Sequence, residues 1–319
     1  MSRIIISVIF LTIVFTGCGT KVKLGEYSKS SMVKSKNLPS ADKLKATKSK
    51  VLITKFEVVS NRIATNANLG VVAASAVSNQ LAKTNSVDVI KRETNYIDLK
   101  KEVEAAELSR ELNIDTGSAE FLITGKVTGA SFAHQFIQGR SWRDKNGKLH
   151  KSPNKFRYRG CSSGTIGFYK LPSMQNVKSV PFSRCSTNSE NTQGNYGAKK
   201  RDDGLVQNSI QSAIRSISKS LKSQFTKKGY ILEKRVDGKK TIFLTTLGKD
   251  VGAKESLDVY IYSSRASVNP ISGEKMEQSI KIGEGEISNQ ISADSSWVVL
   301  EELDDGEEMK IGDFIKINY

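Results

Sequence analysis

The sequence predicts two folded domains: an α/β (α+β) layered domain with a mixed sheet, followed by a small all-β, SH3-like barrel. Three observations carry this prediction. Its 319 residues are enough for two apolar cores. Strand-like and helix-like segments alternate between residues 50 and 228, as in layered folds. After Gly229, short strand-like segments separated by Gly turns replace the helical periodicity, which is typical of a small barrel.

The N-terminal segment contains the most informative residue, Cys18. Ile4 to Phe15 is an apolar run of about a dozen residues, too short to span a bilayer core of ~30 Å but fitting the apolar region of a secretory signal. The following Thr16-Gly17-Cys18 resembles the end of the bacterial lipobox, whose Cys is acylated and becomes the first mature residue. We predict a lipoprotein signal peptide over 1–17 and lipidation of Cys18. An ordinary signal peptide with an incidental Cys is the alternative.

Residues 18–49 follow the predicted lipidation site and are rich in Lys and Ser, with almost no aromatic side chains. This composition predicts a flexible Lys-rich tether that holds the folded body away from the membrane. The two folded domains are then expected over 50–228 and 229–319.

The first domain is expected to begin with alternating strands and helices. Asn66 or Asn68 can cap the first helix, whose apolar residues recur at helical spacing. β-branched runs indicate the strands. The expected elements are a strand over 51–59, a helix from 66 or 68 to about 83, a strand over 87–90, a helix from Asn95 through Leu112, and a strand over 121–132.

Cys161 and Cys185 are expected to lie on the two strands of a hairpin. The expected strands, 156–170 and 177–185, flank a turn at 171–176 almost symmetrically, so the two thiols face each other. A pair of cysteines in an oxidising compartment favours a disulfide, which would stabilise the fold by roughly 3 kcal/mol. The alternative is a metal-binding or reactive thiol pair, which no His or carboxylate cluster supports. Polar stretches without apolar periodicity are expected over 133–155 and 186–203.

The rest of the chain supplies one long helix and the barrel. Apolar residues from Val206 to Phe225 step three or four positions at a time, which predicts an amphipathic helix to about Lys227. The barrel is expected to have five strands, placed between Gly turns. They are 241–247, 257–262, 281–288, 297–303 and 313–318.

Charge is unevenly distributed along the chain. The formal net charge is +16, with +7 over 19–50, +12 over 139–201 and −6 over 229–319. Basic runs are typical of solvated tethers and loops, and they also attract anionic surfaces such as lipid head groups, lipopolysaccharide or cell-wall polymers. Anionic envelope polymers are therefore candidate partners, whereas nucleic acid is a poor partner for an exported chain.

The sequence offers no recognisable catalytic, cofactor-binding or metal-binding set. The run 160–164 matches the G-x-S-x-G nucleophile elbow, but a strand is expected after it where the elbow needs a helix. The two histidines, His134 and His150, precede it, although the elbow's catalytic His follows its Ser. Neither His lies in a zinc-binding motif. We therefore expect a protein that is not an enzyme and uses no cofactor.

The segment from Lys50 to Phe132 resembles the curli-secretion (CsgG-like) lipoprotein family. The similarity consists of residue patterns: 51–59, Leu69-Gly70 before a small-residue helix ending at Asn79-Gln80-Leu81, 87–92, the acidic helix 102–112, and 119–127. Members are outer-membrane lipoproteins with a periplasmic α/β domain, often in rings, so the resemblance implies an outer-membrane location facing the periplasm and the capacity to form a homo-oligomer. Gly19, rather than Asp, after the acylated Cys is what outer-membrane sorting implies.

The curli pore builds its membrane barrel from two long hairpins with an apolar lipid-facing side. The corresponding stretches here, 133–155 and 183–203, are basic and rich in Asn and Ser, without that alternation. The second domain resembles the C-terminal barrel of flagellar assembly protein T, a binding or scaffold module. The resembling segments are 247–252, 281–287 and 310–313.

These observations lead to one expected function and two alternatives. The expected function is a non-enzymatic scaffold, anchored in the outer membrane, that binds other envelope proteins in a secretion or surface-organelle assembly resembling curli or the flagellum. The first alternative is a tethered activator of a cell-wall synthesis enzyme, in which the disordered Lys-rich segment lets the folded body reach the enzyme. The second is a subunit of a secretion pore.

Overall fold

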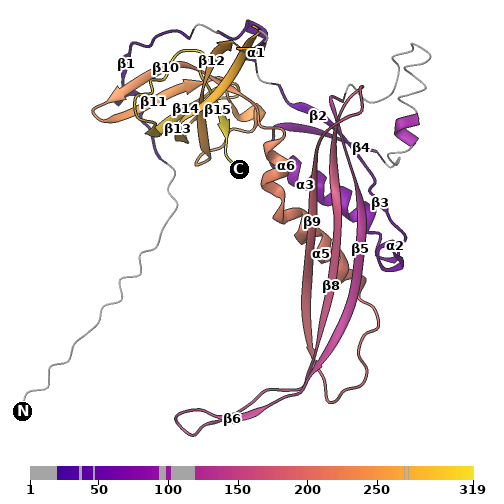
Figure 1. The fold of residues 1–319 in the computed structure, drawn as a ribbon. Helices are drawn as coiled ribbons and strands as arrows, with labels where there is room; N and C mark the ends of the chain where they lie inside the picture. Colours follow the sequence, from indigo (N-terminus) through magenta and orange to yellow (C-terminus); the bar gives the residue numbers. More distant parts are fainter. Residues whose placement is uncertain are drawn as a thin grey trace, which may run out of the picture.

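The computed structural model describes residues 20–35, 38–45, 47–92, 98–101, 119–268, 270–271 and 273–319. The predicted signal peptide and Cys18 lie outside the described residues, as does most of the helix predicted from Asn95. The described chain forms two bodies that lie side by side, each with its own apolar core (Figure 1).

The first body is built on a mixed sheet, as predicted. The strand order is β4-β2-β5-β8-β9, and β3 also pairs with β5. β2 runs parallel to β4 and β5, whereas β5, β8 and β9 are antiparallel to one another. The strands are β2 (Ser49–Thr54), β3 (Glu57–Val58), β4 (Val87–Arg92), β5 (Phe121–Ile137), β8 (Lys155–Lys170) and β9 (Gln175–Asn191).

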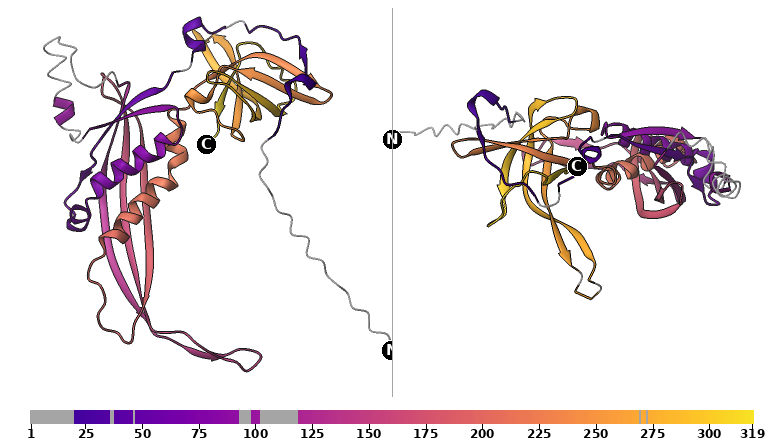
Figure 2. Two further views of the ribbon diagram at one scale, coloured as in Figure 1. Left: turned by 180° about the vertical axis from the view of Figure 1, so that it is seen from behind. Right: turned by 90° about the horizontal axis from the view of Figure 1, so that it is seen from above.

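Helices cover one face of this sheet, with α3 and α5 next to each other (Figure 2). They are α2 (Arg62–Asn66), α3 (Leu69–Ala82), α5 (Asp203–Ser216) and α6 (Ser218–Ser223). Asn61 caps α2 by accepting from Ala64 N, and Asp202 caps α5 by accepting from Leu205 N. The single long helix predicted from Val206 to about Lys227 is two helices, α5 and α6. They are separate because the backbone of Ile217, between them, leaves the helical region.

β5, β8 and β9 extend beyond the helices, and the β6–β7 hairpin lies at their far end (Figure 1). The hairpin consists of β6 (Ser141–Arg143) and β7 (Leu149–Lys151). The polar stretches expected over 133–155 and 186–203 also contain strand, because β5 continues to Ile137 and β9 to Asn191. A small apolar cluster of Phe156, Tyr158 and Leu205 supports this extension on the helical side.

The second body is a closed barrel of six strands. Its order is β10-β11-β14-β13-β12-β15, and pairing of β10 with β15 closes the ring. The strands are β10 (Gly229–Asp237), β11 (Lys240–Thr245), β12 (Asp258–Val268), β13 (Lys275–Ile291), β14 (Ser296–Leu303) and β15 (Phe314–Ile317), with a short helix η2 (Lys249–Val251) after β11. The expected five-stranded, SH3-like barrel is thus corrected, since β10 was missed.

The fold class is mostly β, with several sheets and few helices, rather than a clear α/β layered fold. Within the part of the chain that the structure describes, no helix combines the length and apolar character needed to cross a membrane.

Candidate functional site

The residues that follow the predicted lipidation site are bound to the barrel. Thr20 N donates to Glu286 Oε1 (3.0 Å), and Val22 N donates to Asn289 Oδ1 (2.8 Å). Gln290 Nε2 donates to the carbonyl of Val22 (3.0 Å). Three polar side chains of β13 therefore hold the backbone of the first described residues in place.

The side chain of Val22 is buried against the outer face of the barrel. Only 1% of its surface is exposed, and it packs in a cluster with Ile242 and Trp297. Leu24 and Tyr27, at and beside the short helix η1 (Leu24–Glu26), border the same cluster. These apolar side chains stabilise the association of the segment with the barrel.

The segment continues around the barrel as an added strand. β1 (Ser28–Ser30) pairs antiparallel with β10. Further on, Ile311 N donates to the carbonyl of Val33 (2.9 Å), and Ser35 N donates to the carbonyl of Ile311 (2.8 Å). We call residues 20–35 the strap. A short helix, α1 (Ala41–Leu44), follows it before β2.

The strap corrects the prediction of a flexible tether over 18–49 at residues 20–35. Its average composition is Lys- and Ser-rich, but Val22, Leu24, Tyr27 and Met32 are spaced so that each meets the barrel. An averaged composition does not detect four such contacts. The chain is thus attached to the folded barrel from its first described residue, Thr20.

The barrel surface around the first strap residue is acidic. Glu286, which accepts from Thr20, lies near Asp258, Glu284 and Glu301. Burial raises the pKa of Glu301, and the three neighbouring carboxylates raise it further.

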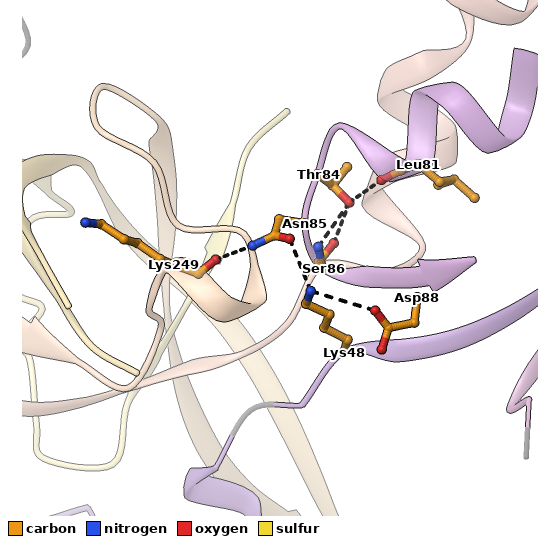
Figure 3. Close-up of polar contacts among 7 residues, drawn as sticks. All are labelled: Lys48, Leu81, Thr84, Asn85, Ser86, Asp88 and Lys249. Carbon is orange, nitrogen blue, oxygen red and sulfur yellow. Dashed lines mark hydrogen bonds and ion pairs between the residues drawn. The ribbon is translucent and has the colours of Figure 1, made fainter. Parts of the chain in front are cut away.

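The two bodies meet at the turn between α3 and β4, shown in Figure 3. Asn85, whose backbone is left-handed (φ 58°), donates from Nδ2 to the carbonyl of Lys249 in the barrel (2.6 Å). Its Oδ1 accepts from Lys48 Nζ (3.2 Å), and Lys48 also pairs with Asp88 (3.7 Å). Thr84 Oγ1 holds the turn by donating to the carbonyl of Leu81 (2.7 Å).

Backbone packing tightens this junction. Gly252 has a positive φ of 103°, and a Cβ at this position would collide with the carbonyl oxygen of Thr84. Lys254 Nζ donates to the carbonyl of Lys83 (2.8 Å), and Lys222 lies 5.2 Å from the ring centroid of Tyr319. Burial lowers the pKa of Lys222, and the charges of Lys83 and Lys254 lower it further. The junction is thus a fitted contact between the two bodies.

The structure joins Cys161 and Cys185 in a disulfide. The two residues face each other in the register of β8 and β9, with Cα atoms 4.0 Å apart. They lie on the sheet face opposite the helices, where Arg159 Nη2 donates to Cys185 Sγ (3.3 Å). The bond ties the edge strand β9 to β8 near the middle of β8, level with the start of α5.

The candidate nucleophile elbow is the middle of a strand. Gly160 to Gly164 lie within β8 rather than at a strand-to-helix turn, and Cys161 is in the disulfide. Ser162 is buried, and its Oγ accepts from Ser209 Oγ of α5 (2.9 Å). Among the described residues, no group of three or more His, Cys, Asp or Glu side chains is placed to hold a metal ion.

Comparison of the sequence with protein-family models and with curated proteins finds no match. Solved structures that resemble the chain include the PelC dodecamer from Paraburkholderia phytofirmans (14% identity, 61% of this chain and 96% of that chain, TM-score 0.29). Others are a minor lipoprotein from Acinetobacter baumannii (9%, 55% and 91%, 0.25) and lipoprotein GNA1162 from Neisseria meningitidis (12%, 53% and 98%, 0.28). TM-scores this low transfer no function. The resemblances to the curli-secretion and flagellar families stay predictions.

Proposed function

We propose that this chain is a lipoprotein anchored in the outer membrane through Cys18, which acts in the periplasm as a non-enzymatic scaffold of a secretion or surface-organelle assembly. The observation that carries the proposal is the lipobox-like run ending at Cys18, followed after one residue by the strap. The curli-secretion and flagellar resemblances supply the type of assembly.

The strap determines how such an anchor would act. One residue, Gly19, separates Cys18 from Thr20, and the two Cα–Cα steps between them span about 7 Å at most. An acylated Cys18 would therefore hold the barrel against the membrane surface instead of releasing the body on a long tether. A scaffold benefits from this geometry, because a fixed distance and orientation define where partner proteins can bind.

The same geometry weakens the alternative of a tethered activator. That function needs a disordered segment of about 28 residues, which stretched fully could cover ~90–100 Å. With residues 20–35 bound to the barrel, most of this length is used. An activator would require the strap to detach, and a variant with a detached strap would then be more active than the wild type.

The alternative of a secretion pore has the length of β5, β8 and β9 in its favour. However, the exposed positions of β8 on the face opposite the helices include Arg157 and Arg159. An Arg side chain facing lipid would destabilise a membrane-spanning strand. Conductance of the purified protein in planar bilayers would revive this alternative.

Two experiments test the proposed function. Crosslinking in cells followed by mass spectrometry is expected to recover envelope assembly proteins bound to this chain. If none is recovered, the proposed scaffold function is contradicted. Membrane fractionation of Gly19→Asp and of the matched Gly19→Ser variant tests the anchoring. Only the Asp variant is expected to leave the outer-membrane fraction, and an unchanged distribution of Gly19→Asp would contradict sorting through Cys18.

A further inference from the structure

The β6–β7 hairpin, residues 140–151, forms the tip of the extended sheet, at the end remote from the barrel (Figure 1). We call these residues the tip hairpin. Its turn is held by Asp144, whose Oδ1 accepts from Asn146 N (2.9 Å) and Lys148 N (3.0 Å). At its base, Arg140 N donates to Ser152 Oγ (3.0 Å), and Ser152 N donates to the carbonyl of Arg140 (2.8 Å). The tip hairpin is therefore a defined structure.

The tip hairpin exposes one large apolar side chain on each of its faces. Trp142 is 51% exposed and stacks on His150, with ring centroids 5.4 Å apart. Leu149 is 48% exposed and pairs with Arg143 across the strands, so it points to the opposite face from Trp142. Neither side chain belongs to an apolar core. A tip that entered an apolar layer end-on would insert both.

The tip hairpin is also strongly basic. Its single carboxylate, Asp144, is occupied by the turn and by His150 Nε2 (2.9 Å), and this hydrogen bond to His150 lowers the pKa of Asp144. In the part of the chain that the structure describes, no carboxylate is paired with its five exposed basic side chains. These are Arg140, Arg143, Lys145, Lys148 and Lys151.

We propose that the tip hairpin binds the surface of a membrane that contains anionic phospholipids, with Trp142 and Leu149 entering the interface and the five basic side chains contacting the head groups. Trp side chains prefer the head-group level of a bilayer, and Lys or Arg near the surface is attracted to anionic lipids. A purely anionic polymer would account for the charges but not for an exposed apolar side chain on each face. The binding is peripheral and does not depend on acylation of Cys18.

The test uses the full chain with Cys18→Ser, so that no lipid anchor contributes. Flotation is measured with vesicles of phosphatidylcholine alone and with vesicles that also contain phosphatidylglycerol. Binding is expected only with phosphatidylglycerol, together with a blue shift of Trp142 emission measured in a Trp297→Phe background. Because one basic residue contributes about fivefold in affinity, and because each Lys→Glu change also adds a repelled negative charge, K145E/K148E is expected to bind at least about thirtyfold more weakly. W142A is expected to weaken binding severalfold.

The matched control is K239E/K240E, which makes the same charge change at another exposed hairpin turn, between β10 and β11. It is expected to bind like the parent. An equal loss in K239E/K240E would show that net charge alone drives binding and would overturn the proposal. Binding to dextran sulfate without binding to phosphatidylglycerol vesicles would overturn it in favour of an anionic polymer. Unchanged unfolding transitions of the tip variants establish that the losses are not due to misfolding.

Discussion

Truncation of Val22 tests whether the strap is part of the folded barrel. Val22→Ala removes two buried methyl groups from the cluster with Ile242 and Trp297. At about 0.8 kcal/mol for each buried carbon, the transfer term is about 1.6 kcal/mol, and a small cavity raises the loss to about 2 kcal/mol. The same substitution at Val33, which lies in the same strap with 57% of its surface exposed, is expected to change stability by less than about 0.5 kcal/mol.

The free energy of unfolding of the two variants is measured by urea unfolding, followed by the emission of Trp297 in a Trp142→Phe background. A second readout is tryptic cleavage after Lys21 and Lys23 under native conditions. If the strap opens and closes faster than it is cut, a loss of 2 kcal/mol makes cleavage about thirtyfold faster. Equal stabilities of Val22→Ala and Val33→Ala, with equal cleavage rates, would refute the docking of the strap.

Three further predictions concern the disulfide, the junction and a buried carboxylate. Replacing the disulfide by C161A/C185A is expected to lower the free energy of unfolding by roughly 3 kcal/mol, given a sequence separation of 24, and a variant as stable as the oxidised parent in urea would contradict a structural role. Gly252→Ala is expected to destabilise the chain more than Gly238→Ala in the same measurement: both have positive φ, but only Gly252 faces backbone atoms of the other body, so equal losses would argue against a tight junction. Burial raises the pKa of Asp313 above its ordinary value of 3.8, so stability should fall as pH rises from about that value through the raised pKa. Asp313→Asn should remove this slope in a pH series of unfolding, and an unchanged slope would assign it to other groups.

The sequence located elements whose burial pattern is local. The predicted bounds of β8 are within one residue of the observed ones. Along most of the strand, buried apolar or small residues alternate with more exposed ones, and this alternation can be seen in the sequence. The facing positions of Cys161 and Cys185 followed from the symmetry of their hairpin. α5 followed from the apolar stripe of Val206, Ile210 and Ile214.

The elements that were missed depend on contacts between distant segments. β10 begins at Gly229, the expected start of the second domain, and its Glu, Lys and Arg residues interrupt the apolar pattern that indicates a strand. The strap is held by β13, β10 and the residues around Ile311, none of which its own sequence indicates. The outer ends of β5 and β8 are covered by Leu205 from beyond β9.

Part of the candidate membrane-binding site could have been found in the sequence. The basic charge of the segment 139–201 was evident, and one interpretation of it was attraction to an anionic surface. Trp142 among five basic residues was the more specific signal. Only the fold shows that this Trp is exposed at the end of a long sheet and that Leu149 occupies the opposite face.

The most direct test of the account is mass spectrometry of the N-terminal peptide of protein extracted from the membranes of the cells that produce it. We expect a peptide that begins at Cys18 and has the added mass of three acyl chains. A peptide that begins at Met1, with Cys18 unmodified, would contradict the anchor and the position of the barrel at the membrane.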